Sequence, residues 1–323
     1  MTNLDSLQKF WSQEGFNPEG KKLLLAVSGG SDSVALLEFF HNEITPHSRC
    51  QLFAVHINHN LRSEADADQA FVEKLCQDRN IPLEVEVLDP GKRGSGESVE
   101  MWGRAHRYRA FSNARKKTGA DFTLTAHHRD DVVETFCLRM LRGTGFAGLA
   151  GIPFQRNERQ ENIVRPLLPV SRTDLKKWLM EIGTSWREDI SNTNLEIPRN
   201  WVRHRLLPEW RKEEPDLDDR IFRLTQEVTK LRPSWEKWLD VFYPQEEVKA
   251  RGGIPMEWIR NETADADFLK RLLPLLGVQK PQPQVMAEIL RQTQDSQGNI
   301  QVRVDEVTVL TEKSGILKSI FKR

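Results

Sequence analysis

The feature that most constrains the fold is a regular alternation of strand-like and helix-like segments in the first 130 residues. Short apolar or alternating runs, which predict strands, are separated by stretches of ten or more residues with helical spacing. The predicted strands are 22–27, 51–57, 82–88 and 122–126, and the predicted helices are 34–40, 66–78 and 98–117. This alternation favours an α/β fold with a parallel sheet covered by helices on both faces.

The second half of the chain changes to a mainly helical pattern. A helix is predicted to run to about Glu181 from a cap at Ser171 or Thr173, and residues 199–242 are mostly helical in character. The tryptophans in this stretch are interpreted as core side chains rather than as a surface for stacking bases.

Two loops and a terminal alternation complete the pattern. Residues 91–96 predict a flexible loop and residues 279–284 a linker or turn, whereas 300–310 alternates and predicts a small terminal hairpin with 314–321. The expected domains are a catalytic α/β domain with a helical extension at 1–212, and a small α+β appendage, helical and then a hairpin, at 213–323.

Charge is unevenly distributed along a chain that is neutral overall. The 323 residues include 47 Lys and Arg against 47 Asp and Glu. Residues 1–100 carry a net charge of −7, residues 101–212 carry 21 basic and 12 acidic side chains for a net of +9, and residues 213–323 carry −2. A basic middle third is typical of a surface that binds a polyanion, although a solvated surface with a chance charge pattern remains the alternative.

The apolar runs and the cysteines argue against two classes of protein. The longest purely apolar run is Leu23–Val27, far short of the ~20 residues that cross a bilayer, and residues 1–9 lack the pattern of a signal peptide. Cys50, Cys76 and Cys137 are too widely spaced for a Cys-x-x-Cys pair and form no disulfide framework. The prediction is a soluble, cytoplasmic protein with no membrane partner.

The strongest local motif is SGGSDS at 28–33, between the first predicted strand and helix. Glycines let backbone N–H groups approach phosphate oxygens, serines add hydroxyl groups, and a helix N-terminus adds a favourable dipole. Asp32 cannot bind phosphate directly, so it is predicted to be a Mg²⁺ ligand. The motif matches neither the Walker loop nor the dinucleotide fingerprint. A purely structural strand-to-helix turn, which favours the same residue types, is the alternative.

A second motif, HHRDDVVET at 127–135, follows the last predicted strand. On a helix, His127, Asp131 and Glu134 would share one face, and Asp130 would lie one turn before Glu134. Such a group can hold Mg²⁺ or a substrate amine, and a carboxylate can accept a proton from an ammonium group. The alternative is that the acids only cap the helix. The pattern is not HExxH, which disfavours a zinc protease.

Several stretches together resemble one known family. The loop at 28–33 alone resembles the ATP-pyrophosphatase, or PP-loop, superfamily. The tRNA(Ile)-lysidine synthetase family is resembled over about residues 20–210, in order and spacing, by LAVSGGSDSVALL from residue 25, VHINHNLR at 55–62, ESVEMWGRAHRYRAF at 97–111, LTAHHRDDVVETFCLRMLRGTGFAGLAGI at 124–152, RPLLPVSR at 165–172 and WREDISNTNLEIPRNWVRHRLLP at 186–208.

This resemblance implies an adenine nucleotide alpha hydrolase-like fold and a ligase activity. The family uses ATP with Mg²⁺ to adenylate the C2 oxygen of the wobble cytidine in the CAU anticodon of an isoleucine tRNA. The amine of L-lysine then displaces AMP to form lysidine, and the tRNA changes from methionine to isoleucine identity. The resemblance leaves the oligomeric state open, a homodimer included.

The same resemblance implies residue roles. Asp32 would hold Mg²⁺, with Asp131 as a further ligand left open. Asp131 and Glu134 would bind or deprotonate the lysine amine, and Arg107 would stabilise phosphate charge. ATP phosphates would be held by Ser28, Gly29, Gly30, Ser31, Asp32 and Ser33, and substrates would be contacted by Arg104, His127, Asp130, Arg142, Arg199, Asn200 and Arg203. For Arg199, Asn200 and Arg203 the alternative is a capping and ion-pair network, and for Arg104 and Arg107 it is an ordinary exposed helix face.

Two other functions remain open at this point. A tRNA thiolase of the same superfamily would need a catalytic cysteine or an iron–sulfur cluster, and Cys137 is interpreted as a small core residue. A nucleotide- or RNA-binding module with an inactive site is the second alternative. The presence of Asp32, Asp131 and Glu134 argues against it.

Overall fold

A computed structural model of the chain contains two compact units. It describes residues 4–60, 64–92, 99–156, 162–188, 194–251, 253–259, 266–276, 278, 283–295, 301–304, 307–311 and 316–321. The first unit comprises Met1–Val132 and Ile152–Asn194, and the second comprises Val133–Gly151 and Leu195–Arg323. The predicted domain boundary after residue 212 stays a prediction, because compact units defined by contacts need not coincide with domains.

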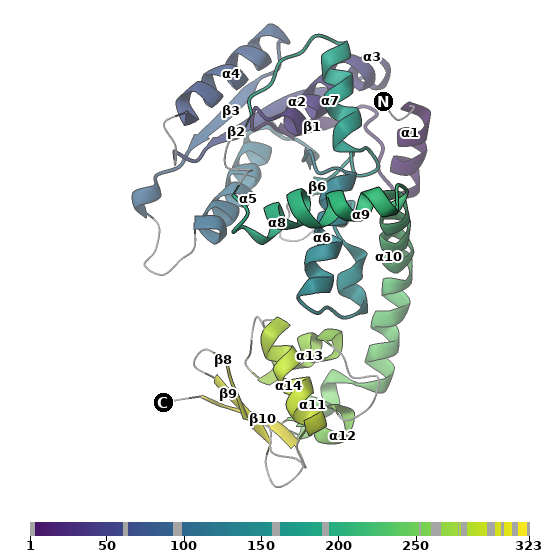
Figure 1. Cartoon of the computed structure of the whole chain (residues 1–323). Helices are drawn as coiled ribbons and strands as arrows, with labels where there is room; N and C mark the ends of the chain where they lie inside the picture. Colours follow the sequence, from purple (N-terminus) through teal and green to yellow (C-terminus); the bar gives the residue numbers. More distant parts are fainter. Residues whose placement is uncertain are drawn as a thin grey trace. The chain divides into compact units, whose positions relative to one another are not determined.

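The first unit is built on a six-stranded sheet with the order β3-β2-β1-β4-β6-β5 (Figure 1). All neighbouring strands run parallel except β5 and β6. The strands are β1 (Lys22–Ala26), β2 (Gln51–Asn58), β3 (Leu83–Val87), β4 (Phe122–Leu124), β5 (Gln155–Arg156) and β6 (Ile163–Val164). The predicted α/β class is confirmed, as are the four strands expected in the first half.

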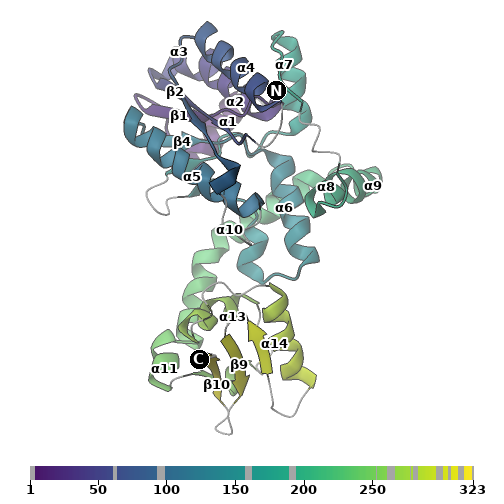
Figure 2. The same ribbon diagram turned by 90° about the vertical axis from the view of Figure 1, so that its left-hand side faces the viewer.

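Helices cover both faces of this sheet (Figure 2). The chain passes from β1 to β2 and β3 in one direction across the sheet and then crosses back to β4 on the other side of β1. Because such crossovers are right-handed, α2 (Ser31–Phe39) and α4 (Ala65–Asp78) lie on one face and α5 (Val99–Thr118) on the other. Leu24 packs with residues of α5, whereas its strand neighbours Leu23 and Leu25 point to the α2 face. All three leucines are fully buried, so the sheet has two covered faces.

Further elements of this unit lie around α2 and the edge strands. They are α1 (Leu4–Gln13), a π-helical turn η1 (Phe40–Ile44), α3 (Thr45–Ser48), a 3₁₀ turn η2 (Pro90–Lys92), the first turn of α6 (Arg129–Leu141) and α7 (Arg172–Glu181). Trp11 of α1 stacks on Phe40 with ring centroids 5.7 Å apart. Ser171 caps α7, since its hydroxyl accepts the Asp174 N–H at 3.0 Å. The predicted loop at 91–96 lies mostly outside the described residues.

The second unit is mainly helical and contains two apolar clusters. Val133 and Cys137 of α6 pack with Val202 and Ile221 in one cluster, and Phe268 and Ile289 belong to the other. Its elements are the rest of α6, η3 (Phe146–Ala150), α8 (Pro198–Trp201), the π-helical turn η6 (Val202–Leu206), α9 (Leu207–Glu213), α10 (Leu217–Phe242), α11 (Gln245–Arg251), α12 (Met256–Ile259), α13 (Ala266–Leu272), η7 (Leu273–Leu276) and α14 (Pro283–Asp295). The predicted linker at 279–284 falls largely outside the described residues.

A four-stranded sheet with the order β7-β10-β9-β8 ends the described chain. Its strands are β7 (Ile254–Pro255), β8 (Gln301–Val304), β9 (Val307–Thr311) and β10 (Ile316–Phe321), and neighbouring strands pair antiparallel. The expectation of one strand over 300–310 is wrong, because β8 and β9 pair with each other. Val302 and Val304 alternate in β8 and Val307 and Val309 in β9, but the step of three from Val304 to Val307 breaks the period of two where the turn lies.

Three of the four tryptophans at 199–242 are partly buried against apolar clusters rather than fully in the core, namely Trp210, Trp235 and Trp238. Trp235 and Trp238 stack with ring centroids 4.9 Å apart and pack against the Phe268 cluster. Trp201 differs, because 43% of its surface is exposed. Within the described residues, no helix combines the length and apolar character that crossing a bilayer requires.

Candidate active site

The Ser28–Ser33 loop joins β1 to α2 at the carboxyl edge of the parallel sheet, the edge at which open α/β folds bind ligands. Gly29 has a φ of 92°, and a Cβ there would lie 3.4 Å from Val72 Cγ2. Gly30 is the N-cap of α2 and supplies no side-chain capping bond. The exposed N–H dipoles at this helix start therefore suit an external anion such as phosphate.

Two serines of the loop hold its shape. The Ser28 N–H donates to Ser33 Oγ at 3.1 Å, and the Ser33 hydroxyl donates to the Gly30 carbonyl at 3.0 Å. The two hydroxyl oxygens are 3.1 Å apart. Ser33 therefore closes the loop on itself, and the backbone is left to supply most of the donors for a phosphate.

Arg187 contacts the same loop through its backbone. The sequence analysis did not predict a role for it. Its N–H donates to the Gly29 carbonyl at 2.9 Å, and its backbone forms a parallel bridge with Gly30. Its Nε lies 3.0 Å from Asp68 Oδ1. Because the Gly29 carbonyl is held toward Arg187, the N–H of the same peptide points to the opposite side. The only sequence signal was its place in the stretch at 186–208.

Asp32 lies in a group of charged side chains at the start of α2. Its carboxylate is 3.4 Å from His128 Nε2 and 3.5 Å from Arg172 Nε, and 30% of the side chain is exposed. Burial opposes the charged form, but the bonds and charges of His128, Arg172 and Ser31 outweigh it and lower the pKa of Asp32 to about 2. Asp32 is therefore an ionised, partly open carboxylate at neutral pH.

His128 is the buried centre of this group. It is 1% exposed, and its Nε2 lies 3.5 Å from Asp131 Oδ2 while its Nδ1 lies 3.6 Å from Asp130 Oδ2. Burial alone would lower the pKa of His128, yet the carboxylates of Asp131, Asp32 and Asp130 raise it. The imidazole thus favours its protonated form and offsets part of the negative charge around it.

Asp130 and Asp131 also organise two helix starts. The Asp131 carboxylate accepts the His128 N–H at 3.0 Å, a capping contact three residues apart. Asp130 accepts the N–H of Arg172, the first residue of α7, at 2.8 Å. The capping alternative is therefore realised for Asp131, whereas Asp130 caps α7 instead of its own helix, and both acids also lie near His128.

The expected position of His127 on the helix is wrong. Helix α6 begins at Arg129, so His127 precedes it and does not share a helical face with Asp131. Its Nδ1 instead lies 2.9 Å from Thr125 Oγ1. The reason is local, because the bond from the His128 N–H to Asp131 makes His128 the cap residue directly before the helix.

Around Asp32, one carboxylate is suited to hold Mg²⁺. Mg²⁺ prefers one or two carboxylates together with phosphates and water, and Asp32 offers an ionised, partly exposed carboxylate beside the phosphate-type loop. Asp131 already accepts a backbone N–H. Among the described residues, no group of three or more His, Cys, Asp or Glu side chains is arranged to hold a metal by itself. Asp32 is thus the side chain that would hold Mg²⁺ together with a bound phosphate.

Glu134, in the second unit, is enclosed by two arginines. Arg203 donates to its carboxylate from Nε at 2.5 Å and from Nη2 at 3.0 Å, and Arg199 donates from Nε at 2.7 Å. The Glu134 side chain is only 2% exposed. This geometry realises the ion-pair network for Arg199 and Arg203, the alternative to substrate contact.

The other predicted residues have diverse surroundings. Arg104 and Arg107 are exposed on α5, and Arg142 is exposed directly after α6. Asn200 is buried in α8. The loop that follows Arg142 is close-packed, since a Cβ on Gly145 would lie 2.5 Å from Asp267 Cγ.

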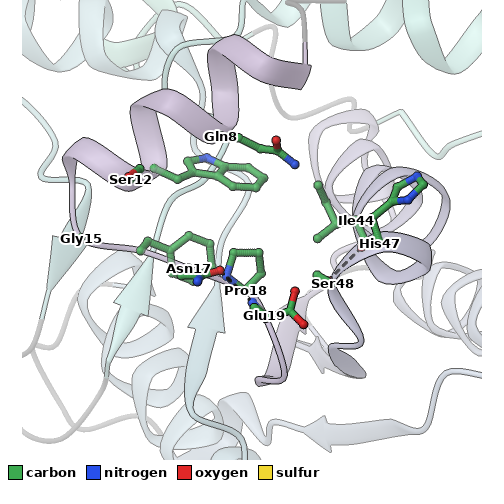
Figure 3. Close-up of a pocket in the computed structure, with 11 residues that line it drawn as sticks. Gln8, Ser12, Gly15, Asn17, Pro18, Glu19, Ile44, His47 and Ser48 are labelled. Carbon is green, nitrogen blue, oxygen red and sulfur yellow. Dashed lines mark hydrogen bonds between the residues drawn. The ribbon is translucent and has the colours of Figure 1, made fainter.

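A hollow of about 520 Å³ lies at the other edge of the first unit (Figure 3). Residues of its wall precede β1 and β2, which places it at the amino ends of the strands, away from the Ser28–Ser33 loop. Its lining includes Trp11, Phe16, Asn17, Glu19, Ile44 and His47. No residue predicted for the active site contributes to it.

The fold and the loop together define a class of protein. A parallel α/β sheet with a Ser-Gly-Gly-Ser-Asp-Ser turn and an uncapped helix start at its carboxyl edge is the arrangement of a PP-loop nucleotide-binding domain. Comparison with protein families agrees, because the PP-loop domain model matches residues 3–210. The chain belongs to the PP-loop family.

Known proteins narrow the resemblance further. The tRNA(Ile)-lysidine synthase of Porphyromonas gingivalis is 34% identical over 276 residues, which are 84% of this chain and 59% of that protein. The tRNA(Ile)-lysidine synthase of Thermotoga maritima is 33% identical over 69% of this chain and 53% of its own length. The chain therefore spans little more than half the length of these relatives.

A solved structure shows the same fold in a different enzyme. The U34-tRNA thiolase NcsA from Methanococcus maripaludis, determined with its [4Fe-4S] cluster, has a TM-score of 0.59 over 70% of this chain and 78% of its own, at 13% identity. The likeness concerns the fold alone. In this chain Cys50, Cys76 and Cys137 are all buried, and burial raises the pKa of Cys76 and of Cys137 to about 11. Those surroundings are the reverse of what activates a thiol.

Proposed function

We propose that this chain carries out the ATP-dependent ligation of L-lysine to C2 of the wobble cytidine in a CAU-anticodon isoleucine tRNA. The reaction has two steps. The cytidine C2 oxygen attacks the α-phosphorus of ATP and releases pyrophosphate, and the lysine ε-amine then displaces AMP from C2. The product is lysidine, and the tRNA changes from methionine to isoleucine identity.

One observation carries this proposal above all. The identity to tRNA(Ile)-lysidine synthases extends over 84% of the chain, well beyond the PP-loop that the wider superfamily shares. Asp32 and Asp131, from separate segments of the sequence, both lie beside His128 in the structure. The second motif is thus next to the phosphate-type loop, as adenylation followed by amine attack requires.

The residues of the loop are proposed to bind the phosphates of ATP. The N–H groups at the start of α2 would donate to phosphate oxygens, and Arg172, 3.5 Å from Asp32, would add positive charge. Asp32 would hold Mg²⁺, which supplies charge neutralisation of the pyrophosphate leaving group. The low pKa of Asp32 keeps this carboxylate ionised across the physiological range.

Asp131 is proposed to receive the lysine amine. A free amine of this kind has a pKa of about 10.4, so lysine arrives as an ammonium and must lose a proton before it attacks. Asp32, Asp130 and Asp131 all lie within 3.6 Å of His128, so three carboxylates are close together to attract an ammonium. Asp131 would then accept the proton as a general base.

The predicted action of Glu134 on lysine is less well supported than that of Asp131. Its carboxylate already accepts three bonds from Arg199 and Arg203 and is almost fully buried. A base of this kind would have to exchange an arginine for the substrate. The geometry favours the interpretation that Glu134 acts by holding the two arginines.

The experiment that tests the proposal measures pyrophosphate release from the purified chain. Sustained release over many turnovers is expected only when ATP, Mg²⁺, lysine and a CAU-anticodon isoleucine tRNA are all present. A transcript whose wobble cytidine is replaced by uridine serves as the control. Release that proceeds equally with the uridine transcript, or without any tRNA, would overturn the proposal.

A further inference from the structure

Four side chains on the α5 face of the sheet form a cationic cluster. Tyr108 lies at its centre, surrounded by Arg104 from the same helix, Arg156 from β5 and Arg165 directly after β6. Arg104 Nη2 donates to the Tyr108 hydroxyl at 3.0 Å, and Tyr108, Arg156 and Arg104 all lie close enough to Arg165 to shift its pKa. Three guanidinium groups from three separate segments therefore meet at one phenol.

Two arginines of this cluster have no carboxylate partner in the part of the chain that the structure describes. Neither Arg104 nor Arg165 forms an ion pair there; Arg165 donates from Nη1 to the Pro153 carbonyl at 2.6 Å, and its buried Nε has no hydrogen-bond partner. Arg165 is 4% exposed. Burial lowers the pKa of Arg165, and the charges of Arg156 and Arg104 lower it further. A buried cation held near two like charges is costly unless an anion joins it.

The geometry of Tyr108 selects an oxyanion over a stacked base. The Arg104 and Arg156 guanidiniums lie over its ring at 5.0 and 5.2 Å from the centroid, and the ring edge meets Phe111. The ring is thus already covered by cations and by an aromatic neighbour. Because its oxygen accepts a hydrogen bond from Arg104, its own hydrogen is directed elsewhere and can be donated to a phosphate oxygen.

The position of the cluster separates it from the ATP-type loop. The loop opens α2, on one face of the sheet, whereas Arg104 and Tyr108 belong to α5 on the other face. Arg107, Arg109 and Lys116 are also exposed on α5, on more than one side of the helix. Cations spread over a helix surface suit a polymer of phosphates better than a single nucleotide.

We propose that Arg104, Arg156 and Tyr108, with Arg165 beneath them, form a binding site for a backbone phosphate of the RNA substrate. This site rests on the proposed function for the identity of the RNA. It binds a phosphate by charge and by the phenol hydrogen, and it reads no base. It adds Tyr108, Arg156 and Arg165 to the residues that contact substrate.

The test compares RNA binding by charge-removing and charge-preserving variants. Arg104→Gln and Arg156→Gln are each expected to weaken binding of a CAU-anticodon tRNA about tenfold at 0.1 M salt and to reduce the slope of log K against log salt by roughly one unit. Tyr108→Phe is expected to weaken binding about threefold with the slope unchanged, because it removes a hydrogen bond and no charge. Lys9→Gln, which removes one exposed cation from α1, is the control and should change neither quantity.

Three outcomes would overturn the site. The first is that both arginine variants keep the tRNA affinity and the salt dependence of the unaltered chain. The second is that Tyr108→Phe reduces the slope of log K against log salt as much as the arginine variants do. Loss of ATP affinity with tRNA affinity retained would assign the phosphate to the nucleotide instead. If the unaltered chain bound no tRNA at any salt concentration, the proposed function would fail and the RNA assignment with it. If the unaltered chain binds tRNA and the variants bind it equally well, the proposed site is wrong and the proposed function is unaffected.

Discussion

Helix α6 carries two charged clusters that differ in composition and access. At its start, Asp32, Asp130 and Asp131 surround His128, with Arg172 as the second cation, and the Asp32 side chain is partly open. One turn further on, Glu134 alone receives Arg199 and Arg203 and is closed to solvent. The first cluster has an excess of acids, and the second has an excess of cations.

This difference teaches that a shared motif need not imply a shared role. Three carboxylates at one partly open site can take up Mg²⁺ or an ammonium. A buried carboxylate between two guanidiniums has its lone pairs occupied, and removing it strands two cations. The acids of HHRDDVVET are therefore assigned to two tasks, chemistry at Asp131 and organisation at Glu134.

The largest expected effect is on catalysis at the open cluster. Asp32→Asn removes the negative charge proposed to hold Mg²⁺, and pyrophosphate release should fall about 1,000-fold, since such charge stabilisation is worth several kcal/mol. The fold should persist, as monitored by far-UV circular dichroism. Ser12→Ala, an exposed serine of α1, is the matched control. Release within a factor of three of the unaltered chain would remove Asp32 from the mechanism.

The second effect is on stability at the closed cluster. Glu134→Gln leaves Arg199 and Arg203 without their anion and should lower the free energy of unfolding by about 3 kcal/mol, because breaking a buried pair on one side strands its partners. Urea unfolding checks this value. If the free energy of unfolding of Glu134→Gln lay within about 0.5 kcal/mol of that of the unaltered chain, the usual range for surface substitutions, the carboxylate would not be needed for stability.

A smaller effect separates the two arginines. Arg203 makes two bonds to Glu134 and is the more buried, whereas Arg199 makes one. Lysine cannot reproduce a two-bond guanidinium contact, so Arg203→Lys should cost roughly 1 kcal/mol more than Arg199→Lys. Equal losses in urea unfolding would show that the second bond contributes little.

The smallest effect is the pH dependence of His128. Its pKa is raised in the folded chain, so its contribution to stability is fully present below the unfolded value of about 6.5 and is lost as the pH rises through the folded pKa. The stability difference between the unaltered chain and His128→Gln should therefore shrink from pH 6 to higher pH. A difference that grows over this range would mean that the histidine is buried in its neutral form.

Local patterns in the sequence were sufficient for much of the fold. The four strands of the first half were predictable because short apolar runs between helical segments are typical of buried strands, and Ser171 was recognisable as a helix cap. The break between β8 and β9 was missed, although the step of three from Val304 to Val307 interrupts the alternation of valines. The start of α6 was also misjudged, because the side-chain bond from Asp131 to the His128 N–H decides it.

The candidate site divided in the same way. The loop at 28–33 could be recognised because its residue types have a local reason to occur together. Pairing partners distant in sequence could not, and Arg187 on Gly29, Arg172 on Asp32 and Arg165 on Tyr108 all emerged only from the fold. Whether Glu134 was a base or an ion-pair partner depended on α8 and η6, which its own motif does not contain.

The division of labour along α6 is tested most directly by following two labels on the same tRNA. Asp131→Asn should form tRNA that carries labelled AMP and should fail to incorporate labelled lysine. Glu134→Gln, measured at equal folded protein, should reduce both signals in proportion if its role is structural. The contrary result is equal loss of AMP and lysine in Asp131→Asn together with selective loss of lysine in Glu134→Gln, which would assign the base to Glu134 and contradict the account.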